Sequence, residues 1–280
     1  MGWMADEYHI ITRRHAPAVI TGKPLGLGGS LGRDEATGRG AFLVIEELAR
    51  RRRIDPGRAR VAVQGFGNAG YHVARLLQGA GYRVVAVSDS QGGIHADAGF
   101  DIESLYRQKQ ATRHLDGVYC EGSVCREVAH THLTNAELLE LDVDLLVPAA
   151  LENQITSANV DRIRAQIVVE VANGPVAADV DARLHDRGVV VVPDVLANTG
   201  GVTVSWFEWV QNRQGFPWTL EEVRQRLAAT MTRAFDDTWA VAEADGVSLR
   251  SAAYGVAFRR LDTALAALGT RAYFRGESTA

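Results

Sequence analysis

The segment RVAVQGFGNAG, residues 60–70, decides the fold of this 280-residue chain. Its beginning is a short, mostly apolar run that predicts a buried strand. Gly65, Gly67 and Gly70 follow in the spacing G-x-G-x-x-G, directly before a helical pattern. In this context the first glycine allows a tight turn, the second lets the backbone approach a pyrophosphate, and the third lets the helix pack closely on the strand. The flanking strand and helix favour a dinucleotide loop over a glycine-rich turn without a ligand.

Strand and helix patterns alternate over the middle of the chain. Mostly apolar runs of strand length occur at residues 60–66, 82–90, 142–147, 167–172 and 189–195. Helical patterns separate these runs, and apolar strands joined through helices are typical of a parallel sheet that is buried on both faces. We therefore expect an α/β fold built on a doubly wound, Rossmann-type parallel sheet.

The flanking segments are predicted to be helical. Helical spacing covers residues 1–14 and 35–53, a Gly- and Pro-rich connector lies between them, and only helical patterns follow residue 195. We expect a single dinucleotide-binding domain over residues 1–280. It would comprise an N-terminal helix with its connector, a Rossmann core and a C-terminal helical layer, at residues 1–32, 33–205 and 206–280.

Composition excludes several classes of partner. Thirty Lys and Arg against 34 Asp and Glu give a net charge of −4, so no basic field favours nucleic acid or an anionic membrane. The sequence shows neither a signal-peptide pattern nor an apolar run long enough to span a membrane, which indicates a cytoplasmic protein. Cys120 and Cys125 form no ligand pattern, so we expect two ordinary thiols and no metal.

Asp89 bears on the choice between the two nicotinamide dinucleotides. It ends the second predicted strand, 19 residues after Gly70, where an acid binds the adenosine ribose hydroxyls of NAD. Ser90 and its neighbours are small and polar, and a 2′-phosphate fits beside such residues if a cation is near. NAD is therefore slightly favoured over NADP. A turn-forming role for Asp89 before the glycines at 92–93 is the alternative.

Three later strand ends carry small or amide side chains. Ala149 and Ala150 follow the third strand, Asn173 follows the fourth, and Asn198 follows the fifth. In open α/β sheets the ligand binds beyond the carboxyl ends of the strands. Together with the glycine loop, these turns predict one shared cleft.

In their order along the chain, these segments resemble the glutamate/leucine/phenylalanine/valine dehydrogenase family. The likeness covers nearly the whole chain and rests on GWMADEY (2–8), TGKPLGLGGSLGRDEATGRG (21–40), VQGFGNAG (63–70), VSDSQGG (87–93), PAALENQIT (148–156), EVANGP (170–175), PDVLANTGGVTVSWFEWVQN (193–212) and LRSAAYGVAFRR (249–260). The chain looks like the glutamate type, because a polar residue, Ser205, stands where the enzymes for apolar amino acids have an apolar one.

The resemblance implies a role for each matching residue. Ser205 would hydrogen-bond the side-chain carboxylate of glutamate, and Val202 would line the same pocket. Thr37, Asn198 and the nearby Arg33 would hold the nicotinamide end of the cofactor. The pyrophosphate cradle would be Gly65, Gly67, Asn68 and Ala69, and the remaining groove would be lined by Ala149, Ala150 and Asn173.

The resemblance also implies that cofactor binding and catalysis are carried by different domains of the enzyme. In the family, the catalytic lysines and the proton-transferring acid precede the segment that resembles GWMADEY, so we expect no catalytic residue in this chain and no activity from it alone. The complete enzyme would convert L-glutamate to 2-oxoglutarate and ammonia, and would bind both only with that further domain. Family members form hexamers mainly through the same domain, which leaves homo-oligomerisation of this chain open. A non-catalytic dinucleotide sensor or regulatory module is the alternative function.

Overall fold

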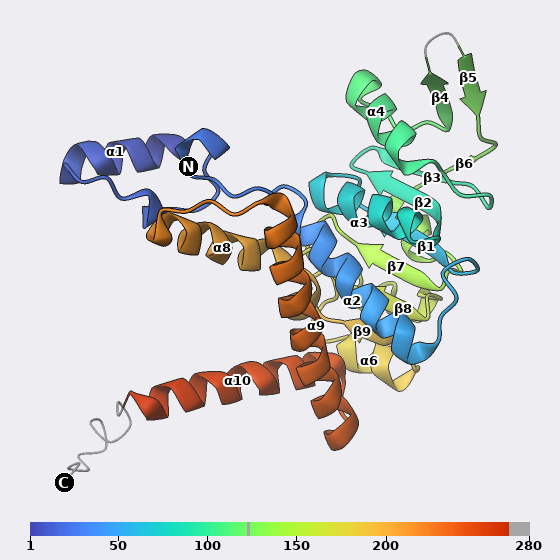
Figure 1. Cartoon of the computed structure of the whole chain (residues 1–280). Coiled ribbons are helices and arrows are strands. Elements are labelled where there is room, and N and C mark those ends of the chain that lie inside the picture. The colour runs from blue at the N-terminus through green and yellow to red at the C-terminus, as the bar shows by residue number, and fades with distance from the viewer. Residues whose placement is uncertain (122–123, 269–280) are drawn as a thin grey trace.

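A seven-stranded sheet forms the centre of the molecule, in the order β6-β3-β2-β1-β7-β8-β9 (Figure 1). The computed structural model describes residues 1–121 and 124–268, and describes no side chain in 118–127. Five neighbouring strands run parallel: β2 (Arg83–Asp89), β1 (Arg60–Gln64), β7 (Leu145–Pro148), β8 (Ile167–Val169) and β9 (Val190–Val192). The chain adds β2 on one side of β1 and β7 on the other, so the winding reverses between β1 and β7. The predicted doubly wound parallel core is confirmed.

Two antiparallel strands that were not expected from the sequence extend the sheet at one edge. There β3 (Gly92–His95) pairs antiparallel with β2, and β6 (Thr131–Leu133) pairs antiparallel with β3. The glycines that begin β3 indicated a turn, and strands of three or four residues show no useful periodicity, so only pairing with β2 defines them. A separate hairpin joins β4 (Val118–Glu121) to β5 (Val124–Glu127). The expectation for Cys120 and Cys125 falls on this hairpin, outside the described side chains.

Helices cover both faces of the sheet, because alternate strand residues enter two separate cores. Val61 and Val63 of β1 join the larger core, whereas Ala62 between them joins the smaller one. The larger core packs under α2 (Ala36–Arg52), α3 (Asn68–Gly79), α4 (Ile102–Thr112), α8 (Gly200–Gln214) and α9 (Leu220–Asp245). The smaller core packs under α5 (Asn135–Leu139), η3 (Val160–Arg162) and α6 (Asp181–Asp186).

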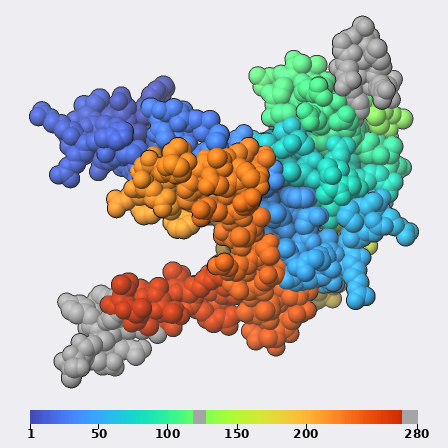
Figure 2. Space-filling model, viewed as in Figure 1, coloured from blue at the N-terminus to red at the C-terminus, as the bar shows by residue number. Residues whose placement is uncertain are grey.

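Two helical projections leave the same side of this body (Figures 1 and 2). One comprises α1 (Gly2–Thr12), the connector with η1 (Pro17–Val19) and η2 (Leu25–Leu27), and α8. The other is α10 (Leu249–Ala267), which follows α9. The short α7 (Asp194–Ala197) leads from β9 into α8, and α8 is continuous across residue 205, where the Rossmann core was expected to end. No helix in the described ranges is long and apolar enough to cross a membrane.

Candidate dinucleotide-binding site

The glycine loop closes the turn from β1 into α3 at the point where the winding reverses. Gly65 has φ +93°, a left-handed conformation that favours glycine, and a Cβ there would lie 2.8 Å from the backbone of Ala149. A Cβ on Gly70 would lie 1.9 Å from the carbonyl oxygen of Gly65. A Cβ on Gly67, by contrast, would meet nothing within 4 Å. Gly65 and Gly70 are therefore required by packing, whereas Gly67 keeps open the space in front of the loop.

The first turn of α3 faces that open space. Its N-cap is Gly67, and no side chain caps the helix, so its first N–H groups are available to an anion. The side chain of Asn68 is turned away, because its Nδ2 donates to the carbonyl oxygen of Asp34 at 2.6 Å. Asn68 and Ala69 therefore offer backbone rather than side-chain groups to a phosphate.

A groove with a volume of about 580 Å³ lies at the carboxyl ends of β7, β8 and β9. The structure brings together eight residues that the sequence had singled out: Arg33, Thr37, Ala149, Ala150, Asn173, Asn198, Val202 and Ser205 all line it. They come from four separate stretches of the chain. The close approach of Gly65 to Ala149 places the glycine loop beside this groove.

Hydrogen bonds and close packing within the chain position several polar groups of the groove. Asn198 Nδ2 donates to Asn173 Oδ1 at 2.7 Å, which joins two strand-end turns. A Cβ on Gly201 would lie 2.5 Å from Thr37 Oγ1, so the missing side chain lets α8 approach the start of α2. Arg33 Nε is buried and has no hydrogen-bond partner within the described part of the chain. A buried donor of this kind is costly unless a ligand or water satisfies it.

Glu35, between Arg33 and Thr37, anchors this end of α2. Its carboxylate accepts hydrogen bonds from Arg39 and from Arg224 of α9. Burial by itself would raise the pKa of Glu35, but the hydrogen bonds and charges of the two arginines outweigh it and lower the pKa to about 2. Glu35 is thus ionised at neutral pH and ties α2 to α9.

Val202 and Ser205 line the groove from α8. Val202 is exposed, and Ser205 is half-buried. The Ser205 hydroxyl donates to the carbonyl oxygen of Gly201 at 3.1 Å. To donate to a substrate carboxylate, the hydroxyl must rotate its proton away from that carbonyl.

Asp89 has partners that the sequence did not reveal. Its Oδ2 lies 2.8 Å from Nζ of Lys109 in α4, and its Oδ1 accepts the N–H of Gln91. Lys109 Nζ also donates to the carbonyl oxygen of Phe66 in the glycine loop, at 3.0 Å. Asp89 thus stabilises a turn, which was the alternative role expected for it. The cation of Lys109 lies beside it. Ser90 is exposed at the same turn. Lys109 was not singled out from the sequence, because its distance along the chain hides its contact with the loop.

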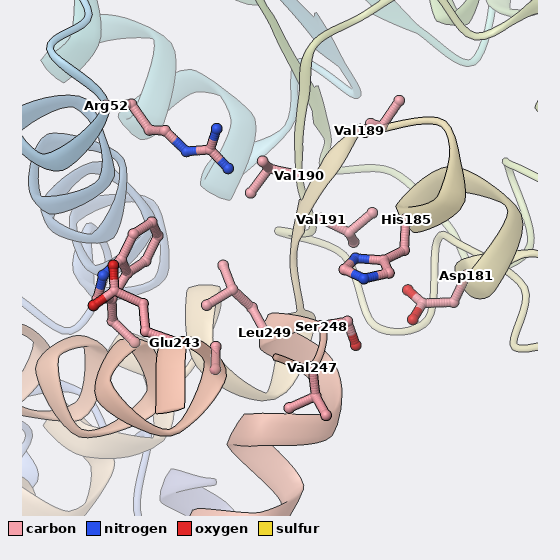
Figure 3. A pocket seen from close by; sticks show the side chains of 13 residues that line it. Arg52, Asp181, His185, Val189, Val190, Val191, Glu243, Val247, Ser248 and Leu249 are labelled. Carbon is pink, nitrogen blue, oxygen red and sulfur yellow. The ribbon is translucent and has the colours of Figure 1, made fainter. Parts of the chain in front are cut away.

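A second hollow, of about 400 Å³, lies between α6, β9 and the α9–α10 junction (Figure 3). Arg52, His185 and Glu243 stand on its walls, but none of the predicted site residues lines it. It meets β9 at residues 190–191, away from the carboxyl ends where an open α/β sheet binds its ligand. No group of three or more acidic, His or Cys side chains within the described residues is arranged to hold a metal ion.

Comparison with known proteins agrees with this geometry. Residues 28–269 match the model of the family described as glutamate/leucine/phenylalanine/valine dehydrogenase. The chain belongs to this family. It is 50% identical to the NADP-specific glutamate dehydrogenase of Synechocystis over 98% of its own length and 64% of the relative's. It is 48% identical to the cryptic catabolic NAD-specific glutamate dehydrogenase GudB of Bacillus subtilis, over 93% and 59%.

Solved structures of the family have the same fold. The hetero-hexameric glutamate dehydrogenase of Thermus thermophilus, in its Leu-bound form, superposes with a TM-score of 0.84 at 40% identity. That match covers 94% of this chain and 60% of the Thermus chain. The chain therefore spans about 60% of the length of the family members it matches. The resemblance drawn from the sequence motifs is confirmed, including its glutamate dehydrogenase type.

Proposed function

We propose that this chain is the NAD(P)-binding domain of a glutamate dehydrogenase, which in the complete enzyme deaminates L-glutamate oxidatively to 2-oxoglutarate and ammonia. The observation that carries the proposal is the groove that holds Asn173, Asn198 and Ser205 and that lies beside the glycine loop, where Gly65 approaches Ala149. The loop has the features of a pyrophosphate cradle, and the groove carries a hydroxyl suited to a substrate carboxylate.

The residues present fit a nicotinamide dinucleotide. The open space in front of Gly67 and the uncapped start of α3 suit the pyrophosphate. In the groove, Asn198 Oδ1 has no hydrogen-bond partner among the described residues, which leaves this acceptor for the carboxamide of the ring. Thr37 and Arg33, which lie beside Gly201, line the same groove as further donors. A nicotinamide dinucleotide held by these residues would supply the acceptor for the hydride of the substrate.

The groove supplies orientation rather than proton transfer. Its lining includes one charged side chain, that of Arg33, and neither a lysine nor an acid is among its described residues. Oxidative deamination needs a general base, whose loss costs about 10²–10⁴-fold in rate. We infer that the base comes from outside this groove, and that the chain alone binds cofactor without turning over glutamate.

The part of the site that would hold the adenosine, around Asp89 and Lys109, suits either NAD or NADP. The carboxylate of Asp89 is suited to ribose hydroxyls, but alone it would repel a 2′-phosphate. Lys109 neutralises that charge and offers a cation to the phosphate. The two relatives, one NADP-specific and one NAD-specific by name, agree with NAD or NADP as the cofactor. We propose that this chain binds both.

The further domain would cover an exposed apolar surface on α1 and α8. Trp3 is 93% exposed and Trp206 is 58% exposed, and such aromatic surface marks an interface. We assign it to the part of the enzyme that the relatives have beyond this match. Alternatively, this surface pairs copies of the chain with one another. Sedimentation of the purified chain distinguishes a monomer from such a homo-oligomer.

Titration of the purified chain with NADH and NADPH tests the proposal. Energy transfer from the five tryptophans to the reduced nicotinamide reports binding. We expect saturable binding of both, and loss of binding in the Gly67→Ala variant. A folded chain that binds neither would overturn the proposal.

A non-catalytic sensor is the competing function, and it also predicts binding. Mixing the chain with the N-terminal part of the Synechocystis relative distinguishes the two. Restored 2-oxoglutarate-dependent oxidation of NAD(P)H supports the dehydrogenase, whereas association without activity supports the sensor.

A further inference from the structure

The turn that carries Asn173 is anchored by one acidic residue. Asp194 Oδ2 accepts the N–H of Gly174 at 2.8 Å, and Gly174 has φ +54° in this turn. Asp194 also begins α7, and its carbonyl oxygen accepts the N–H of Asn198 at 3.1 Å. A single residue therefore holds the neighbour of Asn173 through its side chain and Asn198 through its backbone.

A buried carboxylate fixes Asp194 in turn. Glu170 is fully buried just after β8, its Oε2 accepts the N–H of Asp194 at 2.8 Å, and its Oε1 accepts the N–H of Val176 at 3.2 Å. These two bonds hold both sides of the Asn173 turn against the end of the sheet. Burial raises the pKa of Glu170, which its pairing with Arg250 opposes.

Arg250, near the start of α10, is the cation of this cluster. Its Nη2 lies 2.8 Å from Glu170 Oε1, its Nη1 lies 3.5 Å from Asp194 Oδ1, and its Nε donates to Asp181 Oδ1 at 2.9 Å. Asp181 lines the hollow shown in Figure 3, whereas Asn173 lines the cofactor groove. Arg250 thus connects α10 and Asp181 of α6 to the residues that anchor the Asn173 turn.

We infer that Asp194, held by Glu170 and Arg250, is a positioning residue that sets the Asn173–Asn198 pair for the nicotinamide ring. This inference rests on the proposed cofactor function. It assigns to α10 a role in cofactor geometry, because the helix supplies the guanidinium that neutralises the acids under the turn. The pyrophosphate cradle lies at a different strand end and does not contact the described members of this cluster.

ADP-ribose provides the test, because it carries the adenosine and pyrophosphate of NADH but lacks the nicotinamide. We expect Asp194→Ala to weaken NADH binding about tenfold, as expected for a lost hydrogen bond to a charged group, while ADP-ribose binding stays unchanged. Asp194→Asn keeps an oxygen for Gly174 N–H and should restore most of the affinity. Asp186→Asn is the matched control: it removes an exposed carboxylate from α6 but none from the Arg250 cluster, and should leave both ligands unaffected.

The outcomes separate this inference from the proposed function. A wild-type chain that binds neither ligand overturns both. If the wild type binds NADH, two results overturn the positioning role alone. In one, Asp194→Ala weakens NADH and ADP-ribose equally; in the other, it weakens neither ligand. Should Asp194→Ala fail to fold, as judged by its melting transition, Arg250→Lys keeps the charge but shortens the reach. It should weaken NADH about threefold relative to ADP-ribose, and an unchanged ratio overturns the inference.

Discussion

Lys23 and Glu208 are 185 residues apart in the sequence, yet Lys23 Nζ lies 2.6 Å from Glu208 Oε1 and both side chains are almost fully buried. Glu208 also accepts the backbone N–H groups of Gly22 and Lys23. The connector is thereby fixed to α8, one helical turn beyond Ser205. Removing one partner would leave the other charge buried without compensation.

We predict that Lys23→Met lowers the free energy of unfolding by about 3–5 kcal/mol, measured by urea denaturation. Glu208→Gln alone keeps an acceptor for the two N–H groups but leaves Lys23 charged. Because the double variant buries no charge, it should regain at least half of the loss. A Lys23→Met chain within about 1 kcal/mol of wild type would contradict the importance of the pair.

The glycine loop predicts opposite effects for two alanine variants. Gly67→Ala adds a methyl group to open space, so its melting temperature should stay close to wild type while dinucleotide affinity falls more than about tenfold. Gly70→Ala places the methyl group against the Gly65 carbonyl, so it should lose about 2–4 kcal/mol of stability. Thermal melts combined with NADH titration measure both. If both variants changed stability and NADH affinity equally, the assignment of the space before Gly67 to the pyrophosphate would be wrong.

Lys109 should discriminate between the two cofactors. Lys109→Met removes the cation beside Asp89, and we expect it to weaken NADPH about tenfold while NADH changes less than about twofold. Arg107→Met is the control, because it removes an exposed cation from the same helix. Parallel titrations with both cofactors decide the matter, and an equal loss for both would mean that Lys109 only supports the loop through Phe66.

Glu35 makes part of the stability dependent on pH. Its folded-state pKa is about 2, against an ordinary value of 4.5, so its contribution is complete above pH 4.5 and is lost as the pH falls toward 2. We expect Glu35→Gln to cost about 2 kcal/mol near neutral pH, and the difference from wild type to shrink below pH 4.5. Denaturation series over this range test it. A pH-independent difference would show that the charge of Glu35 is not what matters.

The sequence by itself determined the parallel core, the glycine loop and the strand-end residues that line the groove: Ala149, Ala150, Asn173 and Asn198. These features depend on local signals: apolar runs of strand length, helical spacing, and glycines at the turn from β1 into α3. The short strands β3 and β6 were missed because they have too few residues for a periodic signal and exist only through pairing with β2.

Only the tertiary structure decided which side chains are partners. The pairs Asp89–Lys109 and Lys23–Glu208 and the acids around Arg250 join residues from about 20 to 185 positions apart. Nothing in the neighbouring sequence marks them, because an ion pair depends on distance in space and on burial, and both arise when helices settle on the sheet. Motifs therefore located the groove, whereas packing decided what holds its polar groups in place.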